Sequence, residues 1–169
     1  MRSHAFKTFA ATALLTTSVS VSIPAAATTV GPDEGCTPGY WKNHTQSWEE
    51  YAPNTTLGSL FTIPAPLASF SGQTMLGALN GGGGPGVTGA ATIMFRAATA
   101  AYLNAAHEGV GYPLRRFTPS PYEPWASDPR LANGIKGAVN DALASLDRPT
   151  ILAPATATDG ADNLGCPLN

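Results

Sequence analysis

The sequence is poor in charged residues, cysteine and histidine. Only 12% of its 169 residues are charged, with nine Lys or Arg against eleven Asp or Glu. No run of basic residues occurs, which argues against nucleic acid or an anionic membrane surface as a partner. Only two cysteines and three histidines are present. Because structural zinc takes four such ligands, a histidine-rich zinc site is excluded.

The sequence also lacks a hydrophobic run long enough to span a bilayer, which needs about 20 residues. One apolar stretch, residues 9–23, is shorter and contains several Thr and Ser residues. Arg2 and Lys7 lie at its start, and three alanines, 25–27, follow it. This pattern predicts a signal peptide over residues 1–27, cleaved after Ala27; an uncleaved anchor is the alternative. We expect a secreted protein, extracellular or periplasmic according to the host.

Residues 28–169 are long enough for one domain with a hydrophobic core. They hold seven basic and all eleven acidic residues, so this part is negatively charged. The chain is rich in Gly (18) and Pro (15) but is 43% hydrophobic, which is too apolar for a disordered chain. We expect a single extracellular domain with long ordered loops.

The two cysteines, Cys36 and Cys166, lie near the two ends of this domain. Export to an oxidising compartment and an even number of cysteines favour a disulfide between them. Closing so long a loop stabilises a fold by about 4–5 kcal/mol in the chain-entropy model. Two free thiols, or a metal shared by both, are the alternatives.

Helix signals recur along the chain, while strand signals are nearly absent. Each expected helix has a capping residue, an apolar period of 3.6 or a terminating Gly or Pro. The expected helices are Pro38 toward Tyr51 after Thr37, a helix capped by Ser71 and ending at Asn80-Gly81, 88–107, 129–146 after Asp128, and a weaker one within 150–163 interrupted by Pro154. The predicted fold is therefore mainly α: a compact bundle of four or five helices with long Gly/Pro-rich loops and ends joined by a disulfide.

The segment 88–107 is the longest regular element expected. It is rich in alanine, and only a narrow strip formed by Thr92, Arg96 and Thr99 is polar. A helix that is apolar almost all round belongs in the middle of a bundle. We expect its alanines to let neighbouring helices approach closely.

The most informative motif is 36–44, Cys-Thr-Pro-Gly-Tyr-Trp-Lys-Asn-His, followed by Trp48. In one interpretation, Trp41 and Trp48 anchor the core, while Asn43 and His44 satisfy buried backbone groups next to the disulfide. In the other, the tryptophan rings stack on a sugar, and Lys42, Asn43 and His44 supply hydrogen bonds. Both interpretations are compatible with the sequence.

A second polar pair, Asn104 and His107, ends the long helix. Because a helix C-terminus favours positive charge, His107 can simply cap the last carbonyls. The alternative brings His107 and His44 together with a carboxylate, such as Glu108 or Glu49, as a metal or acid–base site. That alternative requires the two imidazoles within about 4–5 Å of each other and open to one cleft.

The chain resembles a group of secreted, mostly microbial proteins and modules that carry Gly-Tyr-Trp-Lys-Asn-His followed closely by Trp. The matching residues are 39–44 with Trp48, then 57–58, 74–80, 100–105 and 163–167. No established activity comes with this group, so the resemblance implies export and a shared helical fold. It also implies that five residues belong together: Trp41, Asn43, His44, Asn80 and Asn104.

These observations favour a non-catalytic extracellular or cell-surface domain with a role in binding or assembly. The expected partner is an extracellular ligand or surface polymer, and no cofactor is expected. The candidate binding residues are Trp41, Asn43, His44, Trp48, Asn80, Asn104 and His107. Two alternatives remain open: a metal-binding protein or hydrolase using His44 and His107 with Glu108, and a glycan-binding module using Trp41 and Trp48.

Overall fold

The computed structural model describes residues 33–169, so the expected signal peptide lies outside the described residues. Within 33–169 the chain forms six α-helices and four 3₁₀ helices, and its only β-type pairing is two isolated bridges. The predicted mainly helical fold is confirmed, although the α-helices outnumber the four or five expected. No helix in this part of the chain is long and apolar enough to cross a membrane.

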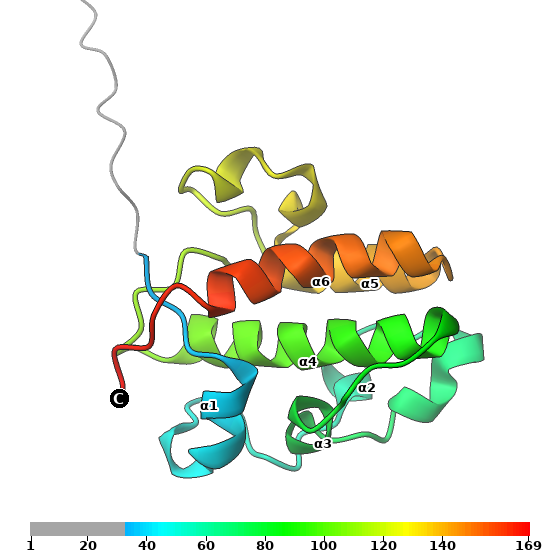
Figure 1. Ribbon diagram of the computed structural model, residues 1–169, viewed down its shortest axis with the longest axis horizontal. Helices are drawn as coiled ribbons and strands as arrows, with labels where there is room; N and C mark the ends of the chain where they lie inside the picture. Colours follow the sequence, from blue (N-terminus) through cyan, green and yellow to red (C-terminus); the bar gives the residue numbers. More distant parts are fainter. Residues whose placement is uncertain (1–32) are drawn as a thin grey trace, which may run out of the picture.

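The longest helix, α4, lies between two layers of shorter elements (Figure 1). One layer holds α5 (Gly134–Ala144) and α6 (Arg148–Asp162), and the other holds α1 (Pro38–Asn43), α2 (Leu57–Leu60) and α3 (Met75–Leu79). The 3₁₀ helices are η1 (Thr45–Ser47), η2 (Ala65–Phe70), η3 (Trp125–Ser127) and η4 (Pro129–Leu131). The first and last described segments lie side by side at one end of the molecule.

Helix α4 spans Gly86–Ala106 and forms the centre of the core. Its alanines at 90, 91, 98, 100 and 101 are completely buried or nearly so, and Phe95 and Tyr102 fill the space toward η2 and α2. The expectation that this apolar helix lies in the middle of a bundle is confirmed. Small side chains permit the close approach of α6 along its length.

The first helix is much shorter than predicted, because it ends at Asn43 rather than near Tyr51. Thr37 caps it as expected: its Oγ1 accepts a hydrogen bond from the Tyr40 N–H at 3.1 Å. Side chains at its end take up the last carbonyls, since Asn43 Nδ2 donates to Gly39 O and His44 Nδ1 donates to Tyr40 O. Such bonds compete with continued helix and favour termination.

Two further boundaries differ from the prediction. Helix α3 is capped by Thr74, whose Oγ1 accepts from Gly77 N at 3.0 Å, and not by Ser71, which follows η2. Asp128 caps only the short η4, and α5 begins after Asn133. These shifts leave the predicted mainly helical bundle in place.

Helix α6 continues through Pro154, so the predicted interruption is wrong. Proline lacks an N–H, and the carbonyl that loses its partner belongs to Thr150, in the first turn. Thr150 is exposed, so solvent can satisfy this carbonyl, while the Pro154 ring is buried against the bundle. Burial of the ring and an early position in the helix make this proline tolerable.

The predicted disulfide joins Cys36 to Cys166 across 130 residues of sequence. Backbone pairing reinforces it, because Gly35 N donates to Gly165 O at 2.9 Å. Gly35 also lies directly on the end of α6, where a Cβ atom would collide with the carbonyl of Ala161. We call this region, made of Gly35, Cys36, Gly165 and Cys166, the disulfide junction.

Candidate functional site

Asn104 is the centre of a buried hydrogen-bond network beneath the disulfide junction. Its side chain is completely buried and makes four hydrogen bonds. Oδ1 accepts from Cys36 N at 2.8 Å and from Trp41 Nε1 at 3.1 Å. Nδ2 donates to Cys36 O at 2.8 Å and to Asp162 Oδ1 at 2.9 Å. Because a primary amide can form at most about four such bonds, no capacity remains for a ligand.

Asp162 extends this network at the end of α6. Its Oδ1 also accepts from the Tyr112 hydroxyl at 2.7 Å, and no described residue bonds to its Oδ2. Burial raises the pKa of Asp162 well above its usual range, against the opposing effect of the bonds from Tyr112 and Asn104. Burial likewise raises the pKa of Tyr112, and the neighbouring Asp162 acts in the same direction.

The two tryptophans of the motif take different positions. Trp41 has no exposed surface, so its ring fills the core and cannot stack on a ligand; this corrects its place in a sugar platform. Trp48 is half-buried, and its Nε1 donates to Trp41 O at 2.9 Å. The core-anchor interpretation describes these two residues better.

His107 is the C-cap residue of α4 and lies beside Glu49, in the segment that follows η1. Its Nδ1 accepts from Gly109 N at 3.0 Å, and its Nε2 lies 3.5 Å from Glu49 Oε1. The other carboxylate oxygen of Glu49 accepts from the backbone N–H of Glu108 at 2.9 Å. Glu49, one of the two carboxylates considered, therefore pairs with His107, whereas the side chain of Glu108 is exposed.

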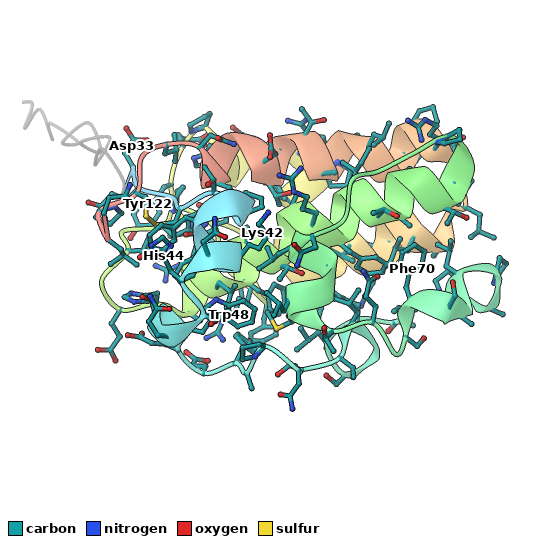
Figure 2. All side chains as sticks on the ribbon, turned by 60° about the horizontal axis from the view of Figure 1, so that its bottom comes forward. Asp33, Lys42, His44, Trp48, Phe70 and Tyr122 are labelled. Atoms are coloured by element: carbon teal, nitrogen blue, oxygen red, sulfur yellow. A yellow bond between two sulfur atoms is a disulfide. The ribbon has the colours of Figure 1, made fainter. Side chains whose placement is uncertain are left out.

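His44 belongs to a different environment from His107. Its ring stacks on Tyr40, with centroids 4.2 Å apart, and Tyr40 packs edge-on against Trp41, which in turn contacts His107 at 5.7 Å. Two aromatic rings thus connect the two imidazoles, and no described group of three or more His, Cys, Asp or Glu is arranged to hold a metal ion. Figure 2 shows His44, Lys42 and Trp48 around α1, with Phe70 at the other end of the molecule.

A surface hollow of about 400 Å³ lies beside the disulfide junction, and we call it the disulfide hollow. One wall comes from the start of the domain: Gly35, Thr37, Gly39, Tyr40, Asn43 and His44. The other comes from its end: Asn163, Gly165, Cys166 and Asn169. The volume falls within the usual range for ligand sites, and the disulfide joins the two walls directly.

Three side chains of the hollow share one arrangement. Asn43, His44 and Asn163 each donate to the backbone carbonyl four residues earlier, at distances of 3.0, 2.9 and 2.7 Å. These bonds use the Nδ1 hydrogen of His44 and one of the two Nδ2 hydrogens of each asparagine, so each asparagine keeps a second N–H. The amide oxygens of Asn43 and Asn163 receive no hydrogen bond from residues 33–169.

Asn80 makes the same kind of bond but lies outside this hollow. Its Nδ2 donates to Leu76 O at 2.8 Å at the end of α3, and its side chain is exposed. No hydrogen bond between described residues joins Asn80 to Trp41 or Asn104. Of the five residues implied to belong together, the structure links Trp41 to Asn104 directly and places Asn43 and His44 in the hollow.

Asn163, Tyr40 and Asp162 were not among the predicted site residues. A signal for Asp162 exists, because it continues the inward stripe Ile151, Ala155, Thr158 at helical spacing. Asn163 could have been found from the predicted disulfide, since residues next to Cys166 must lie near residues next to Cys36.

Comparison with known proteins gave no match to a protein-family model, a curated protein or a solved structure.

Proposed function

We propose that this protein is an exported, non-catalytic helical domain that binds an extracellular ligand in the disulfide hollow. The observation that carries the proposal is the composition of the hollow, where motif residues Asn43 and His44 face Asn163 from the other end of the chain. A preformed hollow of this size with a small number of polar groups is typical of ligand sites.

The covalent and hydrogen-bonded support beneath the hollow favours binding. Cys36 and Cys166 fix the two walls, and Asn104 holds both the N–H and the carbonyl of Cys36. A site on such a rigid support loses little conformational entropy when a ligand binds. The disulfide itself supports export, because such bonds persist in oxidising compartments.

The proposal is tested by titrating residues 28–169 with a library of small polar fragments and recording amide chemical shifts by NMR. We expect some fragments to shift the resonances of Tyr40, His44 and Gly165, and Asn163→Ala to weaken these changes. Asn80→Ala is the matched control, since it loses the same kind of bond outside the hollow. If every fragment left the resonances of the hollow unchanged, the proposed function would be wrong.

A further inference from the structure

The geometry points to Cys166 as a site of reversible thiol modification: a low-molecular-weight thiol that enters the disulfide hollow attacks this sulfur and forms a mixed disulfide with it. The starting point is the unequal placement of the two cysteines. Cys36 has no exposed surface and does not line the hollow, whereas Cys166 is partly exposed and lines it. Only one end of the cross-link therefore faces a space that a small molecule can enter.

The direction of attack makes the two sulfurs unequal as targets. Exchange begins when a thiolate attacks one sulfur of a disulfide, and its rate depends on access to that sulfur. The thiolate approaches in line with the S–S bond, from the side opposite the sulfur that leaves. For attack at Cys166 the leaving sulfur belongs to Cys36 in the core, so the thiolate comes from the side of the hollow. Attack at Cys36 would require an approach through the packed core.

The step exchanges one disulfide for another, so the external thiol is its only co-reactant. This thiol releases its proton to solvent, and its sulfur forms a new S–S bond with Cys166 Sγ. The bond to Cys36 breaks, and its electron pair leaves with Cys36 Sγ, which takes up a proton from solvent. The external sulfur is thereby oxidised to a disulfide, and Cys36 is reduced to a thiol.

Modification should loosen the end of the chain while Cys36 stays in place. Asn104 binds the N–H and the carbonyl of Cys36 at 2.8 Å, and neither bond involves the sulfur. After exchange, two hydrogen bonds within 33–169 still tie the last residues to the start of the domain: Gly35 N to Gly165 O at 2.9 Å, and the Tyr40 hydroxyl to Leu168 O at 3.3 Å. Because Cys36 keeps its position, it can attack the mixed disulfide and restore the cross-link, which makes the modification reversible.

Mapping the mixed disulfide in oxidised residues 28–169 tests the site directly. The folded protein is incubated with 2-mercaptoethanol, the reaction is stopped early with N-ethylmaleimide at mildly acidic pH, and the peptides are analysed by mass spectrometry. We expect mercaptoethanol on Cys166 and maleimide on Cys36 at least about tenfold more often than the reverse, because access controls the rate. The same mapping in urea is the control, since both sulfurs are then accessible and both adducts should form in comparable amounts.

A pair of variants tests whether the thiol arrives through the hollow. A Cβ atom added at Gly39, which lines the hollow, would contact Thr37 Oγ1 at an ordinary 3.6 Å, so a larger side chain has room there and narrows the space. We expect Gly39→Leu to slow exchange at Cys166 at least about threefold. Gly72→Leu is the matched control, because Gly72 lies outside the hollow and its Cβ would meet no atom within 4 Å.

Mixed disulfide on Cys166 of the folded chain, slowed by Gly39→Leu and not by Gly72→Leu, supports the proposal. Equal adducts on both cysteines, a preference for Cys36, or an unchanged rate in Gly39→Leu overturns it. Absence of exchange in the folded chain, under conditions where the chain in urea exchanges, also overturns it. None of these outcomes depends on whether the hollow binds a ligand, so the proposed function is judged separately.

Discussion

At the scale of single residues, the interior of this protein depends on a few polar side chains rather than on hydrophobic packing alone. Asn104 satisfies the two backbone groups of Cys36 and the indole N–H of Trp41. Buried polar groups left without a partner cost about 1–3 kcal/mol each. Two residues of the 36–44 motif, Cys36 and Trp41, are therefore held in place by Asn104, which lies far from them in the sequence.

Replacing Asn104 by Ala should be among the most damaging single changes. It leaves Cys36 N–H, Cys36 C=O and Trp41 Nε1 without partners in a buried place, so we expect the free energy of unfolding to fall by about 4 kcal/mol. Urea denaturation followed by tryptophan fluorescence measures this loss. Asn80→Ala, at an exposed helix end, should cost less than about 1 kcal/mol. Similar losses in the two variants would contradict the role given to Asn104.

Asp162 should make the stability of the domain depend on pH. An unfolded aspartate titrates near pH 4, and burial places the folded pKa well above that value. Between the two values the folded state keeps a proton that the unfolded state has released. The stability contributed by neutral Asp162 is therefore fully present below about pH 4 and is lost as pH rises toward the folded pKa.

Asp162→Asn isolates this contribution, because Asn keeps an acceptor for Asn104 and Tyr112 but cannot ionise. We expect its advantage in melting temperature over the wild type to increase from pH 4 to pH 8. Asp141→Asn, at an exposed position of α5, is the control and should leave the shape of the profile unchanged. A difference between Asp162→Asn and wild type that stays constant with pH would argue against a neutral buried Asp162.

At the scale of elements, local signals predicted the central helix and the last two helices but not all of their boundaries. The alanine-rich, almost wholly apolar composition of 88–107 was sufficient to predict α4, and the cap at Thr37 was sufficient to predict the start of α1. The end of α1 depends on side-chain bonds from Asn43 and His44, which compete closely with further helix. The continuity of α6 depends on burial of Pro154, a tertiary effect that no local pattern contains.

The contact between α4 and the preceding loop, residues 81–85, explains why a glycine, a poor helix former, stands at position 89 inside α4. Gly89, inside α4, packs so closely on Gly84 that a Cβ atom would collide with the backbone there. Arg148, at the start of α6, holds the same loop by donating to the carbonyls of Gly84 and Gly86 at 2.8 Å. The loop is therefore fixed between two helices.

Gly89→Ala should destabilise the fold, although Ala is better than Gly in a helix by about 0.5–1 kcal/mol. Forcing a methyl group into a packed site costs about 1–3 kcal/mol, so we expect a net loss of about 1–2 kcal/mol in urea denaturation. Gly72→Ala is the matched control, since its Cβ would meet no atom within 4 Å. A gain in stability for Gly89→Ala would show that the loop does not press on α4.

At the scale of the whole molecule, the two ends of the domain form both the covalent closure of the fold and the walls of the disulfide hollow. Cysteine number and position predicted the closure. The opposite wall, with Asn163, was not predicted, although the predicted disulfide already places residues next to Cys166 near residues next to Cys36. What the sequence alone does not contain is where α6 ends relative to α1. The residues of the motif therefore lie in two different environments. Trp41 is buried in the core, while Asn43 and His44 line the hollow.

The central claim is that the Cys36–Cys166 bond holds this domain together, and urea denaturation of residues 28–169 with and without reductant tests it most directly. Reduction changes no side chain other than the two cysteines, so the comparison isolates the cross-link. We predict that the reduced chain is less stable by about 4–5 kcal/mol, because its unfolded state regains the freedom of a 130-residue loop. Identical free energies of unfolding for the oxidised and fully reduced chains would contradict the account.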